Sequence, residues 1–127
     1  SLSRKKQEIA PAYYEPIFAS DAANDEGKPP GVAVVLNKLG EVWRALGQPG
    51  KTIYYFQQAL SIHRAKYGEE HVNVAKSLAN LGMAYCHLWQ RDKAKDYFEK
   101  AYKIFNQLYG SEHSLTKTVI RYLNPMA

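Results

Sequence analysis

The sequence predicts an all-α protein built from antiparallel helix hairpins, and two observations carry that prediction. The first is a repeat, because the stretches that begin at Leu36 and Leu78 match one another at an offset of 42 residues within the 127-residue chain. The second is that apolar side chains recur in both stretches at steps of three and four residues, which places them on one face of an α-helix. A repeat period of roughly 20–50 residues is typical of arrays whose units are single supersecondary structures.

The repeat is carried by identical residues at the 42-residue offset. These pairs are Leu36/Leu78, Leu39/Leu81, Gly40/Gly82, Leu46/Leu88, Lys51/Lys93, Tyr55/Tyr97, Phe56/Phe98, Ala59/Ala101, Ile62/Ile104, Tyr67/Tyr109, Gly68/Gly110, Glu70/Glu112 and His71/His113. Trp43 is matched by another aromatic residue, Tyr85. Chance does not produce such a series, so the two stretches are units of one repeat.

Each unit divides into two predicted helices. The apolar face of the first helix consists of Leu36, Leu39, Trp43 and Leu46 in unit one, and of Leu78, Leu81, Tyr85 and Leu88 in unit two. The breaks that follow are Gly47-Gln48-Pro49-Gly50 and Gln90-Arg91-Asp92, and Gly and Pro favour a turn. The second helix carries Phe56, Ala59, Ile62 and Ala65, and then Phe98, Ala101, Ile104 and Leu108. Each unit is therefore predicted to be an antiparallel helix pair.

The glycines and histidines of the repeat have expected structural roles. Gly40 and Gly82 fall inside predicted helices, where glycine costs about 1 kcal/mol relative to alanine. We therefore expect the partner helix to approach too closely there for a side chain. Gly68 is expected to end its helix in a left-handed conformation, as is Gly110. His71 follows Gly68 in the linker, and we expect it to help start the next helix, as does His113 in the second copy.

These residues resemble the tetratricopeptide repeat (TPR), whose pattern has a large apolar residue, Leu-Gly, an aromatic residue, and then Ala and Phe on the second helix. The matching residues are Leu36, Leu39-Gly40, Trp43, Phe56 and Ala59, then Leu78, Leu81-Gly82, Tyr85, Ala94, Phe98 and Ala101. Thr52 stands where the family usually has Ala. The period of 42 exceeds the usual length of about 34 residues. With its Tyr-Gly-x-x-His linker it resembles the subclass found in kinesin light chains.

The resemblance implies a TPR-type superhelix with two clear repeats and flanking capping helices. The predicted units are residues 32–73 and 74–115, and residues 116–127 start a third first helix or form a cap. Residues 1–31 are expected to be a helical segment and polar loop, with residues 12–23 as the second helix of a degenerate earlier repeat. Pro11 and Pro16 argue against one continuous helix there. Because about three units are normally needed for stability, the ends act as caps, the chain is part of a longer array, or it self-associates.

Composition excludes several classes of protein. With 46% hydrophobic and 23% charged residues, the chain is ordinary for a globular domain. The single cysteine, Cys86, rules out an internal disulfide and favours a reducing, cytoplasmic location. The longest apolar run, Val32 to Leu36, is far shorter than the roughly 20 residues that span a bilayer. No nucleophile, paired-carboxylate, phosphate-loop or metal-ligand motif occurs, so we expect no enzyme activity, no cofactor and no metal.

The resemblance further implies a concave groove lined by the first helix of each unit, in which a peptide or a partner helix binds. The expected groove residues are Asn37, Lys38, Glu41, Arg44, Lys76, Asn80, Met83 and His87. Asparagine amides suit a peptide backbone because they both donate and accept hydrogen bonds. Lys and Arg favour an acidic partner. The alternative is that these side chains form only a solvated helix face.

Two further functions stay open from the sequence. One is a structural or oligomerisation segment of a larger repeat protein, which self-associates through its terminal helices. The other is nucleic-acid binding, since the net charge is +5 and ten tyrosines are present, but Asp and Glu are interleaved with the lysines. A clamp for a C-terminal carboxylate is not expected, because its positions hold Asn37, Glu41, Ala79 and Met83.

Overall fold

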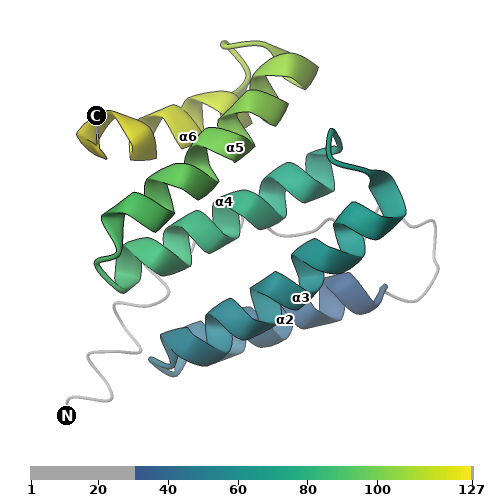
Figure 1. Cartoon of the computed structure of the whole chain (residues 1–127), viewed down its shortest axis with the longest axis vertical. Coiled ribbons are helices and arrows are strands. Elements are labelled where there is room, and N and C mark those ends of the chain that lie inside the picture. The colour runs from purple at the N-terminus through teal and green to yellow at the C-terminus, as the bar shows by residue number, and fades with distance from the viewer. Residues whose placement is uncertain (1–30, 127) are drawn as a thin grey trace.

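The structure is a computed structural model that describes residues 31–126. The expected N-terminal helix over residues 12–23 lies outside this range. The described residues form α2 (Val32–Ala45), α3 (Pro49–Tyr67), α4 (Val72–His87), α5 (Arg91–Tyr109), α6 (Ser114–Leu123) and the short 3-10 helix η3 (Asn124–Met126). Each helix packs on the next one along the chain, so that the array rises from α2 and α3 to α6 in Figure 1. The predicted all-α array of helix hairpins is confirmed.

Each hairpin is held by a close contact between a glycine and a phenylalanine ring. A Cβ atom built on Gly40 would lie 2.5 Å from Cε1 of Phe56, and one built on Gly82 would lie 2.9 Å from Cδ1 of Phe98. Both rings are fully buried. The predicted close approach is confirmed, and the ring itself, rather than the neighbouring backbone, occupies the space that a side chain would need.

The Tyr-Gly-x-x-His linker joins one hairpin to the next. Gly68 has φ 81° and ψ 175°, a conformation that is essentially confined to glycine. The chain then reaches His71, whose Nδ1 accepts a hydrogen bond of 3.0 Å from the backbone N–H of Asn73 and so caps α4. The His71 ring also stacks on Tyr67, with centroids 4.0 Å apart.

The second linker repeats this arrangement at Gly110. Its φ is 82°, the ring of His113 stacks on Tyr109 at 4.3 Å, and His113 Nδ1 accepts a 3.1 Å hydrogen bond from the N–H of Leu115. The predicted role of the two histidines in starting helices is therefore confirmed. Because the cap begins the helix directly after the histidine, α4 starts at Val72 and α6 at Ser114, two residues before the predicted unit starts.

The turns inside the two hairpins differ in one residue. Gly47 has φ 74° between α2 and α3, and Trp89 occupies the corresponding place between α4 and α5 with φ 60°. A positive φ is uncommon for a residue with a side chain and costs free energy. The Trp89 side chain packs on little of the chain, since the residue is 93% exposed. The positive φ of Trp89 therefore follows from the turn, and not from burial of its indole ring.

The core is centred on the second unit and its two flanking interfaces. Leu78, Leu81, Phe98 and Ala101 are buried, as predicted. Four members of the predicted apolar stripes are exposed, although the spacing places each stripe on one face of its helix. These are Leu39, Leu46, Ala65 and Leu108. Thr52, which replaces the usual Ala, is accommodated because its buried hydroxyl donates a 3.0 Å hydrogen bond to the carbonyl of Gln48.

The glycine contact yields a direct prediction. Gly40→Ala and Gly82→Ala should each lower the free energy of unfolding by about 1–3 kcal/mol, because the new methyl group displaces a buried ring. The cost should be larger at position 40, where the clash is closer. Urea titration followed by circular dichroism measures both.

Gly50→Ala is the matched control, since Gly50 lies in α3 and a Cβ there meets nothing within 4 Å. Alanine is the better helix former, so this variant should be unchanged or more stable by up to about 1 kcal/mol. Equal effects at all three glycines would contradict a specific role for the ring contact.

Candidate interaction surface

The predicted groove residues come from the first helices of the two units, α2 and α4. Lys38 and His87 are exposed, while Glu41, Arg44 and Lys76 are half-buried. The other three residues are buried in the structure: Asn37 is 2% exposed, Met83 4% and Asn80 5%. Five of the eight predicted residues are therefore accessible.

Arg44 and His87 bring the ends of α2 and α4 together. Nη2 of Arg44 lies 2.8 Å from Nε2 of His87, within hydrogen-bond distance. Partial burial lowers the pKa of His87, and the neighbouring Arg44 guanidinium lowers it further. The imidazole is therefore neutral at physiological pH and accepts the hydrogen bond from the guanidinium, which keeps its positive charge.

The accessible part of this surface is mainly cationic. The accessible side chains are three cations, Lys38, Arg44 and Lys76, and one carboxylate, Glu41, while His87 adds no charge when it is neutral. Salt screens partly buried charges less than fully exposed ones. The half-buried Arg44 and Lys76 should therefore attract an acidic group more strongly than a fully exposed lysine does. The surface is suited to an acidic ligand.

A second polar feature lies between the hairpins, where His63 of α3 meets Ser77 of α4. Nδ1 of His63 and Oγ of Ser77 are 2.9 Å apart, and both residues are buried. Burial lowers the pKa of His63, and the electrostatic effects of His71 and Lys66 lower it further, while a hydrogen bond with the backbone of Asn73 raises it. The imidazole is therefore held in its neutral form.

The same positions in the next interface hold Phe105 and Val119, which are 42 residues further along and fully buried. The same two repeat positions thus hold a polar pair between α3 and α4 and an apolar pair between α5 and α6. The His63–Ser77 pair is consequently a packing element of the array and not a site with access to a ligand.

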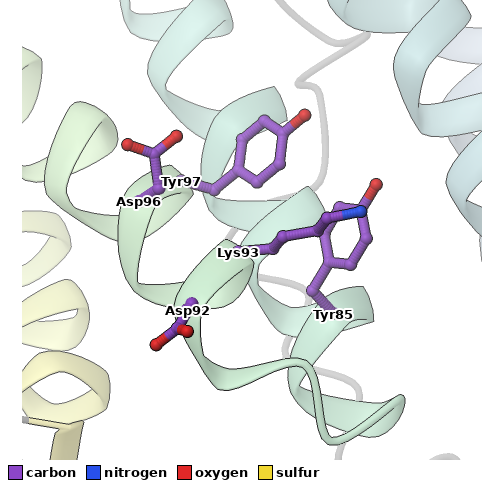
Figure 2. A pocket seen from close by; sticks show the side chains of 5 residues that line it. All are labelled: Tyr85, Asp92, Lys93, Asp96 and Tyr97. Atoms are coloured by element: carbon purple, nitrogen blue, oxygen red, sulfur yellow. The ribbon is translucent and has the colours of Figure 1, made fainter.

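An open depression lies beside the turn between α4 and α5, with a volume of about 360 Å³. Figure 2 shows its five lining side chains, Tyr85, Asp92, Lys93, Asp96 and Tyr97. The two tyrosine rings are stacked 5.5 Å apart, and Nζ of Lys93 lies 5.4 Å from the centre of the Tyr85 ring. None of the predicted groove residues takes part.

The cation–ring contact in this depression is a property of the repeat. In unit one, Nζ of Lys51 lies 3.9 Å from the centre of the Trp43 ring, at the positions that correspond to Lys93 and Tyr85. Because the contact recurs in both units, we attribute it to the packing of each hairpin.

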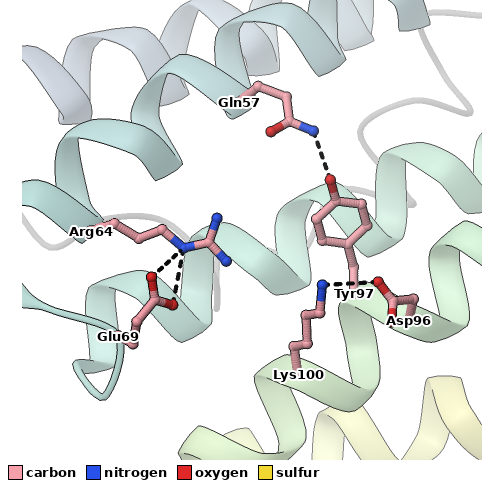
Figure 3. A network of polar contacts seen from close by, with 6 residues as sticks. All are labelled: Gln57, Arg64, Glu69, Asp96, Tyr97 and Lys100. Carbon is pink, nitrogen blue, oxygen red and sulfur yellow. Dashed lines mark hydrogen bonds and ion pairs between the residues drawn. The ribbon is translucent and has the colours of Figure 1, made fainter.

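A polar network joins the second helices of the two units, as Figure 3 shows. Nε2 of Gln57 in α3 donates a 2.7 Å hydrogen bond to the hydroxyl of Tyr97 in α5. On α5 itself, Lys100 pairs with Asp96 at 3.1 Å. The network therefore ties α3 to α5, and part of the positive charge of α5 is neutralised within the helix.

The described residues give little support to a catalytic or metal-binding role. Burial raises the pKa of the Cys86 thiol, against a weaker opposite effect of Arg91, so the thiol is not an activated nucleophile. Across residues 31–126, no three His, Cys, Asp or Glu side chains are arranged to hold a metal ion. No helix in this part of the chain is both long and apolar enough to cross a membrane.

Sequence reasoning did not pair Arg44 with His87, although it placed both in the groove. Their separation of 43 residues differs by one from the repeat period, and both lie in the last turn of a first helix. The repeat register was the signal that could have found them, because it stacks the ends of successive first helices.

Comparison with known proteins agrees with this architecture. The family model described as tetratricopeptide repeat matches residues 31–107. The chain therefore belongs to the tetratricopeptide repeat family. The finer resemblance to kinesin light chain repeats stays a prediction.

Among solved structures, the crystal structure of BtubC (BKLC) from P. vanneervenii is similar, with a TM-score of 0.70 and 22% sequence identity. The match covers 96% of this chain and 48% of that one, so the chain spans about half the length of this structural relative. At this identity the likeness shows the fold alone. No curated protein matches the chain.

The His63–Ser77 pair yields a prediction on pH. The pKa of His63 is lowered in the folded state, so below about pH 6.5 the unfolded chain binds a proton that the native chain does not. The free energy of unfolding should therefore fall as the pH drops from about 6.5 towards the lowered pKa. Urea titrations at a series of pH values measure this loss.

The double variant His63→Phe/Ser77→Val, which copies the next interface, should show a smaller loss at low pH. At neutral pH it should be nearly as stable as the wild type or more stable, because both polar partners are removed together. Each single variant leaves a buried polar group without its partner and should lower the free energy of unfolding by about 1–3 kcal/mol. An unchanged pH dependence in the double variant would contradict this account of His63.

Proposed function

We propose that the chain is a non-catalytic interaction scaffold that captures an acidic extended peptide, or an acidic partner helix, along the surface formed by the first helices of its repeats. Tetratricopeptide repeats generally mediate protein–protein interaction, and they are typically non-catalytic. The observation that carries the proposal for this chain is the 2.8 Å contact between Arg44 and His87. It brings the ends of α2 and α4 within hydrogen-bond distance of one another.

The charge of this surface supports an acidic ligand. Lys38, Arg44 and Lys76 outnumber Glu41, and His87 adds no charge when it is neutral. Exposed ion pairs contribute only about 0.2–1 kcal/mol each, so binding needs several of them at once. Asn37, Asn80 and Met83 are buried in the structure. We therefore expect them to pack beneath the accessible side chains and not to contact the ligand directly.

A structural role within a larger repeat protein is the second candidate, and one observation favours it. The outer face of α2 carries exposed apolar side chains, including Val42 at 53% and Leu46 at 55%. Nucleic-acid binding has weaker support, because Lys95 and Lys100 on α5 lie 3.9 and 3.1 Å from Glu99 and Asp96. A cytoplasmic location belongs to the same proposal and rests on the single cysteine.

The test uses fluorescence anisotropy with a short labelled peptide of alternating Glu and Ser. The wild type should bind it, and should not bind a matched peptide of alternating Lys and Ser. Lys38→Glu/Lys76→Glu should weaken binding about tenfold or more, which corresponds to about 1.4 kcal/mol. The reason is that two attractive charges become repulsive at the surface itself.

Lys95→Glu/Lys103→Glu is the matched control, since it makes the same change in net charge on α5, where both lysines lie. It should weaken binding much less. An equal loss in both variants would mean that only overall charge attracts the peptide, and would contradict a site on α2 and α4. Failure of the wild type to bind the acidic peptide would contradict the proposed ligand class.

A further inference from the structure

Trp89, in the turn between α4 and α5, exposes a large aromatic ring and strains the backbone as well. The residue is 93% exposed and has φ 60°. Gly47 holds the equivalent place in the first hairpin with φ 74°, and the N–H of each residue donates an equivalent backbone hydrogen bond of 3.0 Å. Glycine adopts this conformation without a steric cost, whereas tryptophan does not. The turn therefore favours glycine at position 89, and the core makes no use of the indole.

The depression beside this turn departs from the repeat at the same place. Its two rings and its lysine have equivalents of the same kind in unit one. Asp92 and Asp96, by contrast, stand where unit one has Gly50 and Tyr54. Figure 2 shows both carboxylates on the first turns of α5, directly after the turn that holds Trp89. The exposed indole and the two carboxylates are thus features of unit two alone, and they occur together.

The chemistry of the depression suits an indole side chain. Its volume of about 360 Å³ is at the small end of the range for ligand pockets, about 300–1,000 Å³, so it fits a single ring system. The stacked rings of Tyr85 and Tyr97 offer aromatic surface, and Lys93 offers a cation, for which indole is the best aromatic partner. The indole N–H can only donate a hydrogen bond. Asp92 can accept it, since its carboxylate joins none of the ion pairs within residues 31–126.

We propose that this turn is a self-association surface, at which Trp89 of each of two copies of the chain enters the depression of the other copy. Trp89 does not fill the depression of its own chain, because it is 93% exposed. Since the indole and the depression lie at the same turn, one two-fold axis pairs both indoles with both depressions and closes the dimer. Charge is complementary too, because the exposed Arg91 follows Trp89 closely and accompanies it towards Asp92 of the other copy.

The area of this contact predicts a weak dimer. A buried aromatic side chain removes about 150–250 Å² from water, so two indoles and the surfaces that they cover bury roughly 600–1,000 Å². Stable interfaces bury about 1,200–2,000 Å², and transient ones bury less. The dimer should therefore form reversibly as the protein concentration rises. Lys38, Arg44 and Lys76, which are proposed to bind an acidic ligand, take no part, so either proposal can fail without the other.

The test is sedimentation velocity of the full chain at protein concentrations from about 10 to 500 μM, a range suited to a weak interface. The mass should rise from that of a monomer towards that of a dimer. Trp43→Phe leaves Trp89 as the single tryptophan, and its emission should move to shorter wavelength over the same range, because the indole leaves water. A chain that stays monomeric up to about 500 μM, or an emission that does not change with concentration, would overturn the proposal.

Trp89→Gly identifies the contact, since it installs the residue of the first hairpin. It should weaken dimerisation about tenfold or more and leave the midpoint of thermal unfolding unchanged or higher, which removal of a structural indole would not do. Asp92→Lys should also weaken the dimer, because the indole N–H loses its acceptor. Tyr54→Ala is the matched control, since it removes another exposed aromatic side chain, 59% exposed, and should leave the dimer unchanged.

Three results with these variants would contradict the contact. A dimer that persists in Trp89→Gly would form through another surface. An equal loss in Tyr54→Ala would mean that any exposed ring drives the association. Growth beyond the dimer at high concentration would mean an open head-to-tail contact and would overturn the two-fold arrangement.

Discussion

The contact between a glycine in the first helix and a phenylalanine ring in the second is the constraint on which the rest of the structure depends. At Gly40 and Gly82 the missing side chain lets the ring lie directly on the helix backbone. Each glycine costs helix propensity, and the buried ring more than offsets that cost through its apolar area. The close approach sets the geometry of each hairpin, and so it sets where the hairpin ends meet the linkers.

The linkers convert two hairpins into an array. Gly68 and Gly110 turn the chain with a backbone conformation that other residues rarely adopt, and His71 and His113 then cap the following helix. Histidine is not among the preferred capping residues, which are Ser, Thr, Asp and Asn. Its advantage here is that one ring does two things, since the imidazole accepts the capping hydrogen bond and stacks on the tyrosine that ends the previous helix.

The hairpins, the glycine contact and the histidine caps were predictable because they depend on local patterns that occur twice. The burial of individual side chains was not predictable in the same way, since it depends on which helices pack around a position. Leu39 has the same sequence context as Leu81, yet it is 39% exposed where Leu81 is fully buried, because a helix precedes α4 and none of the described ones precedes α2. Trp89 gave no sign of a turn conformation, since tryptophan does not favour a positive φ.

The candidate surface was predicted in part for the same reason. The repeat register places the proposed surface on α2 and α4, but it does not tell a half-buried Arg44 from a buried Asn37 or Asn80. Within residues 31–126 the contact of Arg44 with His87 occurs once, and the residues at the positions equivalent to Arg44 and His87 are Cys86 and Ala45. Features that distinguish one unit from the other therefore need the structure, and they include the surface that we propose binds the ligand.

A double-mutant cycle between Gly40→Ala and Phe56→Leu tests the central claim most directly, with the free energy of unfolding from urea titration as the measured quantity. If the ring lies where the new methyl group must go, the smaller leucine should relieve the clash. Gly40→Ala should then cost less in the Phe56→Leu background than in the wild type, by about 0.5–3 kcal/mol. Equal costs in the two backgrounds would mean that the two residues do not interact, and would contradict the account.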